Sequence, residues 1–267
     1  VIFVYAWLFI HACWLWPSRQ LLWGPDSVIA PSVYQDGWLN NIFFRLVYVP
    51  QWASTVFFLH LSCAAIAIFS FRGVELFRGV AWLTGCMLYF AAHPAFNSGF
   101  LLMLLLAFYC IVVRTRARHS FRIALNNMAW IAVVIQLMLV YAASAWFKLS
   151  GNMWTQGSAL YYSLHIDQFS NSALIGTFMK QNTTLLMICT YAGLCYQVLF
   201  PIVIWIRKWR LPWLVVGICF HLAIGMFLQL WDFATAMLCA YAFLLDEKIS
   251  GRILSLFNIK TKEWTPS

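Results

Sequence analysis

Long apolar segments separated by short polar ones dominate the pattern of the chain. Most approach the ~20 residues that an α-helix needs to cross the hydrocarbon of a bilayer. Pro, Gly and charged residues bound them. The pattern predicts helices over residues 1–16, 51–71, 80–93, 100–113, 123–147, 184–206, 213–230 and 233–245. The third, fourth and eighth are short for a full crossing, so we expect them to be tilted, re-entrant or buried among their neighbours.

The composition excludes a soluble fold. Of 267 residues, 63% are hydrophobic and only 9% are charged, whereas a soluble domain has roughly 25% charged residues. We predict an all-α, polytopic transmembrane bundle of about eight helices. It forms a single domain over residues 1–267, with a cytoplasmic tail at 246–267. The sequence opens inside an apolar run without an initiator Met, so the natural N-terminus is expected to be incomplete here.

The net charge of +9 reports on topology. Threading eight helices sends four basic residues to one side of the membrane. These are Arg19, Arg45, Lys148 and Lys180. The other thirteen, including Arg72 and Arg78, fall on the opposite side. Short loops rich in Lys and Arg face the cytoplasm, so we expect both termini to be cytoplasmic, residues 17–50 and 149–182 to lie outside, and no nucleic-acid partner.

The two outer segments and the cysteines refine this picture. Residues 17–50 are rich in aromatic residues, which is typical of a piece lying along the interface, and residues 149–182 form the longest polar stretch. All eight cysteines fall inside predicted helices without a pairing or CxxC pattern. We interpret them as small buried apolar residues, and we expect neither a disulfide framework nor a metal site.

Ionisable residues at membrane depth are costly and point to function. Lys148 is the sharpest candidate, because it ends a long helix at the outer boundary with Tyr141 and Ser144 on the same face. A partly buried lysine whose ammonium is desolvated is a usable base. The alternative is a lysine that snorkels, placing its charge among the lipid headgroups.

Other polar residues carry weaker signals. His221 lies between Gly217 and Gly225, and such a stripe admits a neighbouring helix or a flat ligand; the alternative is a histidine bonded across a helix pair. Gln197 lies one turn before Pro201, a pair that a helix kink explains as well as a site does.

Four further residues are interpreted structurally or left open. His93 belongs to a turn, HPAFNSG, and Asp232 is predicted to cap the last helix. His11 and His60 have no partner that the sequence identifies.

The run from Val140 to Tyr162 (VYAASAWFKLSGNMWTQGSALYY) resembles the hallmark segment of the HTTM family, the membrane domains related to the vitamin K-dependent γ-carboxylase. GPDSVIAPS, HPAFNSG, YQVLFP and FH resemble further family segments. The residues that match the central motif are Tyr141, Lys148, Leu149, Trp154, Gly157, Ser158 and Ala159.

The resemblance implies that Lys148 is the base that deprotonates a hydroquinone. Tyr141 and His221 are then candidate catalytic residues, while Trp154, Gln197 and His93 are candidate contacts for a quinone or hydroquinone. The Asn-Asn-His-Ser stretch of the carboxylase is replaced by AFNSGF, and its large lumenal domain is absent. Glutamate carboxylation is therefore not expected.

The size is similar to that of stand-alone bacterial HTTM proteins, including the SdpB-like type. This implies a bacterial inner-membrane protein that acts at the outer boundary on a secreted peptide, a lipid or a quinone. The alternative is a non-catalytic accessory or scaffold subunit of a larger membrane complex, with other membrane-protein subunits and lipids as partners. A transporter ranks third, because no pair of broken helices repeats in two halves.

Overall fold

The computed structural model describes residues 1–24, 27–28, 50–114, 119–166 and 181–245, and every regular element among them is helical. All eight predicted helices are present, which confirms the all-α prediction for this part of the chain. They are α1 (Ile2–Leu15), α4 (Pro50–Ala67), α5 (Val74–Ala91), α6 (Ser98–Ile111), α7 (Ser120–Leu149), α11 (Thr183–Val203), α12 (Arg207–Leu228) and α13 (Trp231–Tyr241).

The helices differ in length. Within the described ranges, α5, α7, α11 and α12 are long and apolar enough to cross a membrane, whereas α1, α4, α6 and α13 are apolar but shorter. The remaining elements are α2 (Arg19–Trp23), α8 (Asn152–Thr155), α9 (Ala159–His165), and the 3₁₀ turns η2 (His93–Ala95) and η3 (Ala242–Leu244). Most of the segment 17–50, part of 149–182 and the predicted tail at 246–267 lie outside the described residues.

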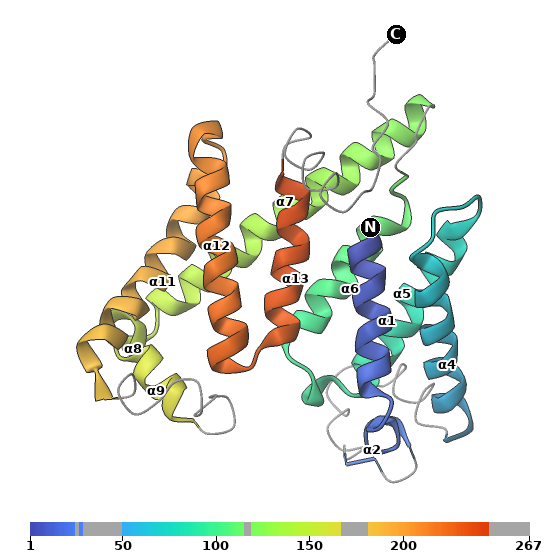
Figure 1. The fold of residues 1–267 in the computed structure, drawn as a ribbon, viewed down its shortest axis with the longest axis horizontal. Helices are drawn as coiled ribbons and strands as arrows, with labels where there is room; N and C mark the ends of the chain where they lie inside the picture. Colours follow the sequence, from blue (N-terminus) through green and yellow to red (C-terminus); the bar gives the residue numbers. More distant parts are fainter. Residues whose placement is uncertain (25–26, 29–49, 115–118, 167–180, 246–267) are drawn as a thin grey trace.

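The helices form two groups joined by one long helix (Figure 1). One group contains α1, α4, α5 and α6, which pack against one another. The other contains α11 and α12 with the short helices α8 and α9. Helix α13 contacts both α6 and α12, and α7 runs obliquely across both groups. At 30 residues, α7 is about 45 Å long.

Helices α6 and α13 approach each other closely at Gly99. A Cβ on Gly99 would lie 2.1 Å from the backbone nitrogen of Phe233, so only glycine fits. Asn97 caps α6 by accepting a hydrogen bond from the Gly99 amide at 2.8 Å, which satisfies one of the free donors of the first turn. The cap and the missing side chain together set the register between α6 and α13.

Two helices begin well before their predicted starts, because each first turn lies in a charged segment that precedes the apolar run. We predicted that the third helix begins at residue 80, with Arg78 in a loop, but α5 begins at Val74 and Arg78 is only 4% exposed. Its guanidinium donates to the carbonyl of Val113 at 2.9 Å, just past the end of α6, where carbonyls lack helical partners. Likewise α12 begins at Arg207 rather than at residue 213.

The cysteines depart in part from their interpretation. All eight are free thiols, but Cys13, Cys189, Cys195 and Cys219 are exposed on the surface of their helices. The prediction that all are buried is wrong for these four. A helix face turned to lipid is as apolar as a core, so hydropathy does not distinguish the two.

Candidate functional site

The end of α7 carries a polar stripe on one face. Tyr141, Ser144 and Lys148 follow one another at helical spacing, and all three side chains turn toward α11 or its neighbours. Lys148 lies in the last turn, where a cation is favoured by the partial negative charge of the helix end.

Lys148 is held by neutral groups. Its Nζ donates to Oε1 of Gln197 at 2.7 Å, and Ser144 Oγ donates to the same oxygen at 3.2 Å. The Nζ also lies 4.4 Å from the ring centre of Trp154, which is a favourable cation–π distance. Among the described residues, no carboxylate forms an ion pair with Lys148. The lysine is half-buried, and its contacts in the described part of the chain are uncharged.

Gln197 is positioned by α11. The side chain is 5% exposed, and the helix begins at an Asn182 cap that accepts from the amide of Leu185 at 3.0 Å. Pro201 lies inside the last turns of α11, where it removes a hydrogen bond but does not end the helix. A buried amide requires a partner, and the Lys148 ammonium and the Ser144 hydroxyl supply two donors to it.

A buried network of hydroxyl groups adjoins the lysine on the α7 stripe. The Tyr141 hydroxyl is hydrogen-bonded to Nε2 of His221 at 2.7 Å and to the hydroxyl of Tyr241. The hydroxyls of Tyr241 and Tyr196 are 2.9 Å apart. His221 is 1% exposed. Helices α7, α11, α12 and α13 all contribute to this network.

The glycine stripe of α12 makes room for this network. A Cβ on Gly217 would lie 2.1 Å from the hydroxyl of Tyr196 and 2.5 Å from that of Tyr241. A Cβ on Gly225 would lie 2.8 Å from the ring of Trp231. The stripe therefore admits aromatic side chains of the protein itself, which accounts for the glycines without a bound flat ligand.

The structure brings most of the predicted site residues together in two adjoining sets. Lys148, Gln197 and Trp154 are in direct contact, and Tyr141 contacts His221. His93 is placed elsewhere: it begins η2, the turn between α5 and α6, in the other group of helices (Figure 1). This agrees with its interpretation as a turn residue.

A second polar cluster was missed in the sequence. His11 Nε2 lies 3.7 Å from a carboxylate oxygen of Asp232, and Asn97 Nδ2 donates to the same carboxylate at 3.4 Å. Trp7 stacks on His11 with ring centres 4.5 Å apart. The prediction that Asp232 caps α13 through its side chain is wrong, because no such bond forms; the carboxylate turns toward α1 and α6 instead.

The partners of His11 and His60 could not be read from the sequence. The imidazole of His60 lies 2.9 Å from the carbonyl of Ala81 and 3.2 Å from the hydroxyl of Thr84, so this histidine joins α4 to α5. His11 and Asp232 are separated by most of the chain. In the sequence, the only indication of this contact is that Asp232 lies near the start of a helix, and a helix cap explains that position equally well.

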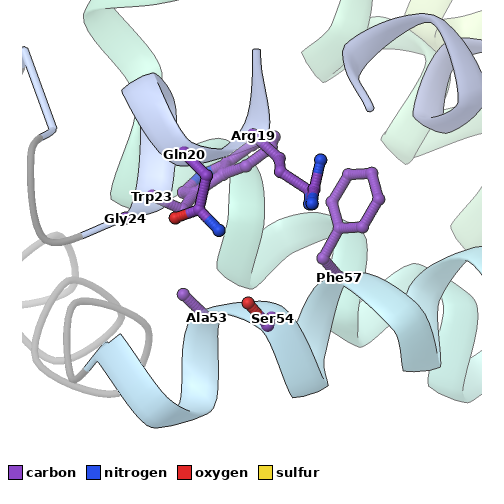
Figure 2. Close-up of a pocket in the computed structure, with 7 residues that line it drawn as sticks. All are labelled: Arg19, Gln20, Trp23, Gly24, Ala53, Ser54 and Phe57. Carbon is purple, nitrogen blue, oxygen red and sulfur yellow. The ribbon is translucent and has the colours of Figure 1, made fainter. Parts of the chain in front are cut away.

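A small cavity lies between α2 and α4 (Figure 2). Its lining consists of Arg19, Gln20, Trp23, Gly24, Ala53, Ser54 and Phe57. The volume of about 10 Å³ holds one water molecule at most. The Arg19 guanidinium donates to the carbonyl of Trp16 at 2.7 Å and lies over its ring. This cavity is too small for a substrate, so the polar stripe of α7 remains the candidate site.

Comparisons with protein-family models, with curated proteins and with solved structures find no match to this chain.

Proposed function

We propose that the chain is a multi-pass protein of the bacterial inner membrane, of the HTTM type, with eight membrane-crossing helices and both termini in the cytoplasm. Its function is base chemistry at the extracytoplasmic boundary, with Lys148 as the base. The substrate is an amphiphile that reaches this boundary from the bilayer or from outside, either a quinol, a lipid or a secreted peptide.

One observation carries this proposal. Lys148 is half-buried, and among the described residues its Nζ contacts Gln197 and the ring of Trp154, both neutral. A lysine that serves only as an anchor gains most from a carboxylate or from free hydration of its ammonium. A base must release its proton in each cycle, and neutral partners permit that without breaking an ion pair.

For a quinol, the reaction begins with proton transfer to Lys148. The Lys148 amine accepts one hydroxyl proton, giving a quinolate and an ammonium. The quinolate passes two electrons and its remaining proton to dioxygen, giving quinone and hydroperoxide anion. The hydroperoxide takes the proton back from Lys148. Quinol and dioxygen thus become quinone and hydrogen peroxide, and Gln197 holds Nζ in place throughout.

The second candidate function is a non-catalytic scaffold in a membrane complex. It is favoured by the aromatic closure of the α12 glycine stripe, since Tyr196, Tyr241 and Trp231 fill the space at Gly217 and Gly225. In this case Lys148 anchors the helix end through its positive charge and takes no part in proton transfer.

The experiment uses the purified protein in lipid nanodiscs with a short-chain menaquinol and dissolved oxygen. Quinone formation is followed by absorbance and peroxide by a coupled assay. Arginine keeps the charge of lysine but effectively never deprotonates. We therefore expect Lys148→Arg and Lys148→Met to lose the protein-dependent rate, by about 100-fold or more, at wild-type membrane levels.

Arg19 offers a control, because its guanidinium also lies over a tryptophan ring, that of Trp16 at 4.5 Å. Arg19→Lys and Arg19→Met should retain the rate. Full activity in Lys148→Arg would remove the base from the proposal and leave the scaffold. No protein-dependent rate in the wild type would exclude a quinol as the substrate.

A further inference from the structure

An apolar groove lies on the outer surface of α7. It has a volume of about 180 Å³ and is lined by α7 residues Trp130 to Leu139 and by Trp205, which follows α11. The Trp130 indole nitrogen donates to the carbonyl of Phe243 at 2.7 Å, so its polar atom is already satisfied. The groove therefore presents apolar surface.

The groove opens outward. Ile135 is 52% exposed, and Leu139 and Trp205 are exposed to a similar degree. These residues belong to, or adjoin, segments long and apolar enough to cross a membrane, so what reaches them there is hydrocarbon. An apolar cavity of about 150 Å³ accepts a benzene molecule, and this groove is large enough for part of an acyl chain.

Positive charge marks one end of the groove. Arg207 and Lys208 follow Trp205 by two and three residues and are both exposed. They lie in the first turn of α12, which contains no acidic residue and carries the partial positive charge of a helix start. Arg210 Nε donates to the carbonyl of Ile204 at 3.0 Å, which fixes the turn that carries both cations.

We propose that this groove and the start of α12 form a binding site for one anionic phospholipid. An acyl chain lies along α7 between Trp130 and Trp205, and the phosphate and headgroup lie against Arg207 and Lys208. Basic clusters where a transmembrane helix leaves the bilayer attract anionic lipids, which are abundant in the cytoplasmic leaflet. On the proposed topology this end of the bundle faces that leaflet. The site is separate from Lys148, so it stands or falls independently of base chemistry.

The experiment measures lipid retention. The full-length protein is exchanged into nanodiscs that contain phosphatidylglycerol and phosphatidylcholine in equal amounts with identical acyl chains. It is then extracted into mild detergent and examined by native mass spectrometry. We expect one phosphatidylglycerol per chain, preferred over phosphatidylcholine by about fivefold or more.

Two variants separate the parts of the site. Arg207→Gln with Lys208→Gln should abolish the preference for phosphatidylglycerol. Leu139→Trp, at an open position tolerant of a larger side chain, should reduce retention of both lipids by filling the groove. Arg72→Gln removes an exposed cation from another turn and should leave retention unchanged. Equal retention of the two lipids by the wild type, or an unchanged preference in the Arg207/Lys208 variant, would overturn the proposal.

Discussion

The two polar clusters of this protein each place a basic side chain between helices, but with different kinds of partner. His11 lies near a carboxylate, that of Asp232, with Asn97 as a third member. Lys148 has an amide and an aromatic ring instead. Both clusters join helices that are distant in sequence. The carboxylate gives His11 an acidic partner, whereas Lys148 contacts neutral groups, so that proton transfer at its amine would break no ion pair among the described residues. The first arrangement suits a structural contact and the second suits proton transfer.

A carboxylate beside Lys148 would make its surroundings similar to those of His11. In a Gln197→Glu variant the carboxylate replaces the amide that accepts from Nζ at 2.7 Å, so the ammonium becomes one half of an ion pair. We expect the quinol-dependent rate to fall about 100-fold or more with little change in thermal stability. The measurement is the menaquinol assay together with thermal unfolding in detergent.

Gln197→Met is the companion variant, since it removes the acceptor without adding charge. It should leave more activity than Gln197→Glu does. Equal rates in wild type and Gln197→Glu would show that the charge state of Lys148 is irrelevant, and the contrast between the two clusters would lose its functional meaning.

The packing that surrounds the Tyr141 network can be broken without touching a charge. The added methyl of Gly217→Ala would meet the hydroxyls of Tyr196 and Tyr241, and such overpacking costs about 1–3 kcal/mol. We expect a lower free energy of unfolding, measured by reversible denaturation in mixed micelles. Gly79→Ala is the control: a Cβ there meets nothing within 4 Å, so stability should stay the same or rise. Equal effects of the two substitutions would contradict the close contact.

The smallest effect is expected at the second cluster. Asp232→Asn keeps the shape of the side chain but removes its charge, and we expect a loss of about 1 kcal/mol of stability and an unchanged menaquinol rate. A double-mutant cycle with His11→Gln isolates the pairwise energy. A coupling energy near zero would mean that the 3.7 Å contact contributes nothing. A large loss of rate would move the functional site to this cluster.

The sequence predicts the helices well and their contacts poorly, for a physical reason. Helix positions depend on local hydrophobicity and punctuation, and the stripe of Tyr141, Ser144 and Lys148 depends only on helical periodicity. Gln197 is the partner of Lys148 because of how α7 and α11 are rotated relative to each other. The helical periodicity of the sequence carries no information about that rotation. The same limit hid the approach of His11 to Asp232.

The prediction for Arg78 was wrong for a different reason. The sequence pattern places Arg78 in a loop, because charged residues are interpreted as bounding the apolar helices. In the structure it is buried beside the end of α6, bonded to the carbonyl of Val113. Arginine can be buried where unpaired carbonyls surround its donors. That is a property of two helix ends meeting in space, and the pattern along one chain does not reveal it.

The length of α7, 30 residues, bears on how the helix would fit a bilayer. A helix of about 45 Å exceeds a hydrocarbon layer of about 30 Å and is accommodated by tilting. One end of this rod carries Lys148, and Arg122 near the other end pairs with Glu75 of α5. Turning such a rod by about 5° about its centre moves each end by about 2 Å, enough to break the hydrogen bond between Lys148 and Gln197. We therefore expect a membrane thickness that tilts α7 relative to α11 to alter the contact between Lys148 and Gln197.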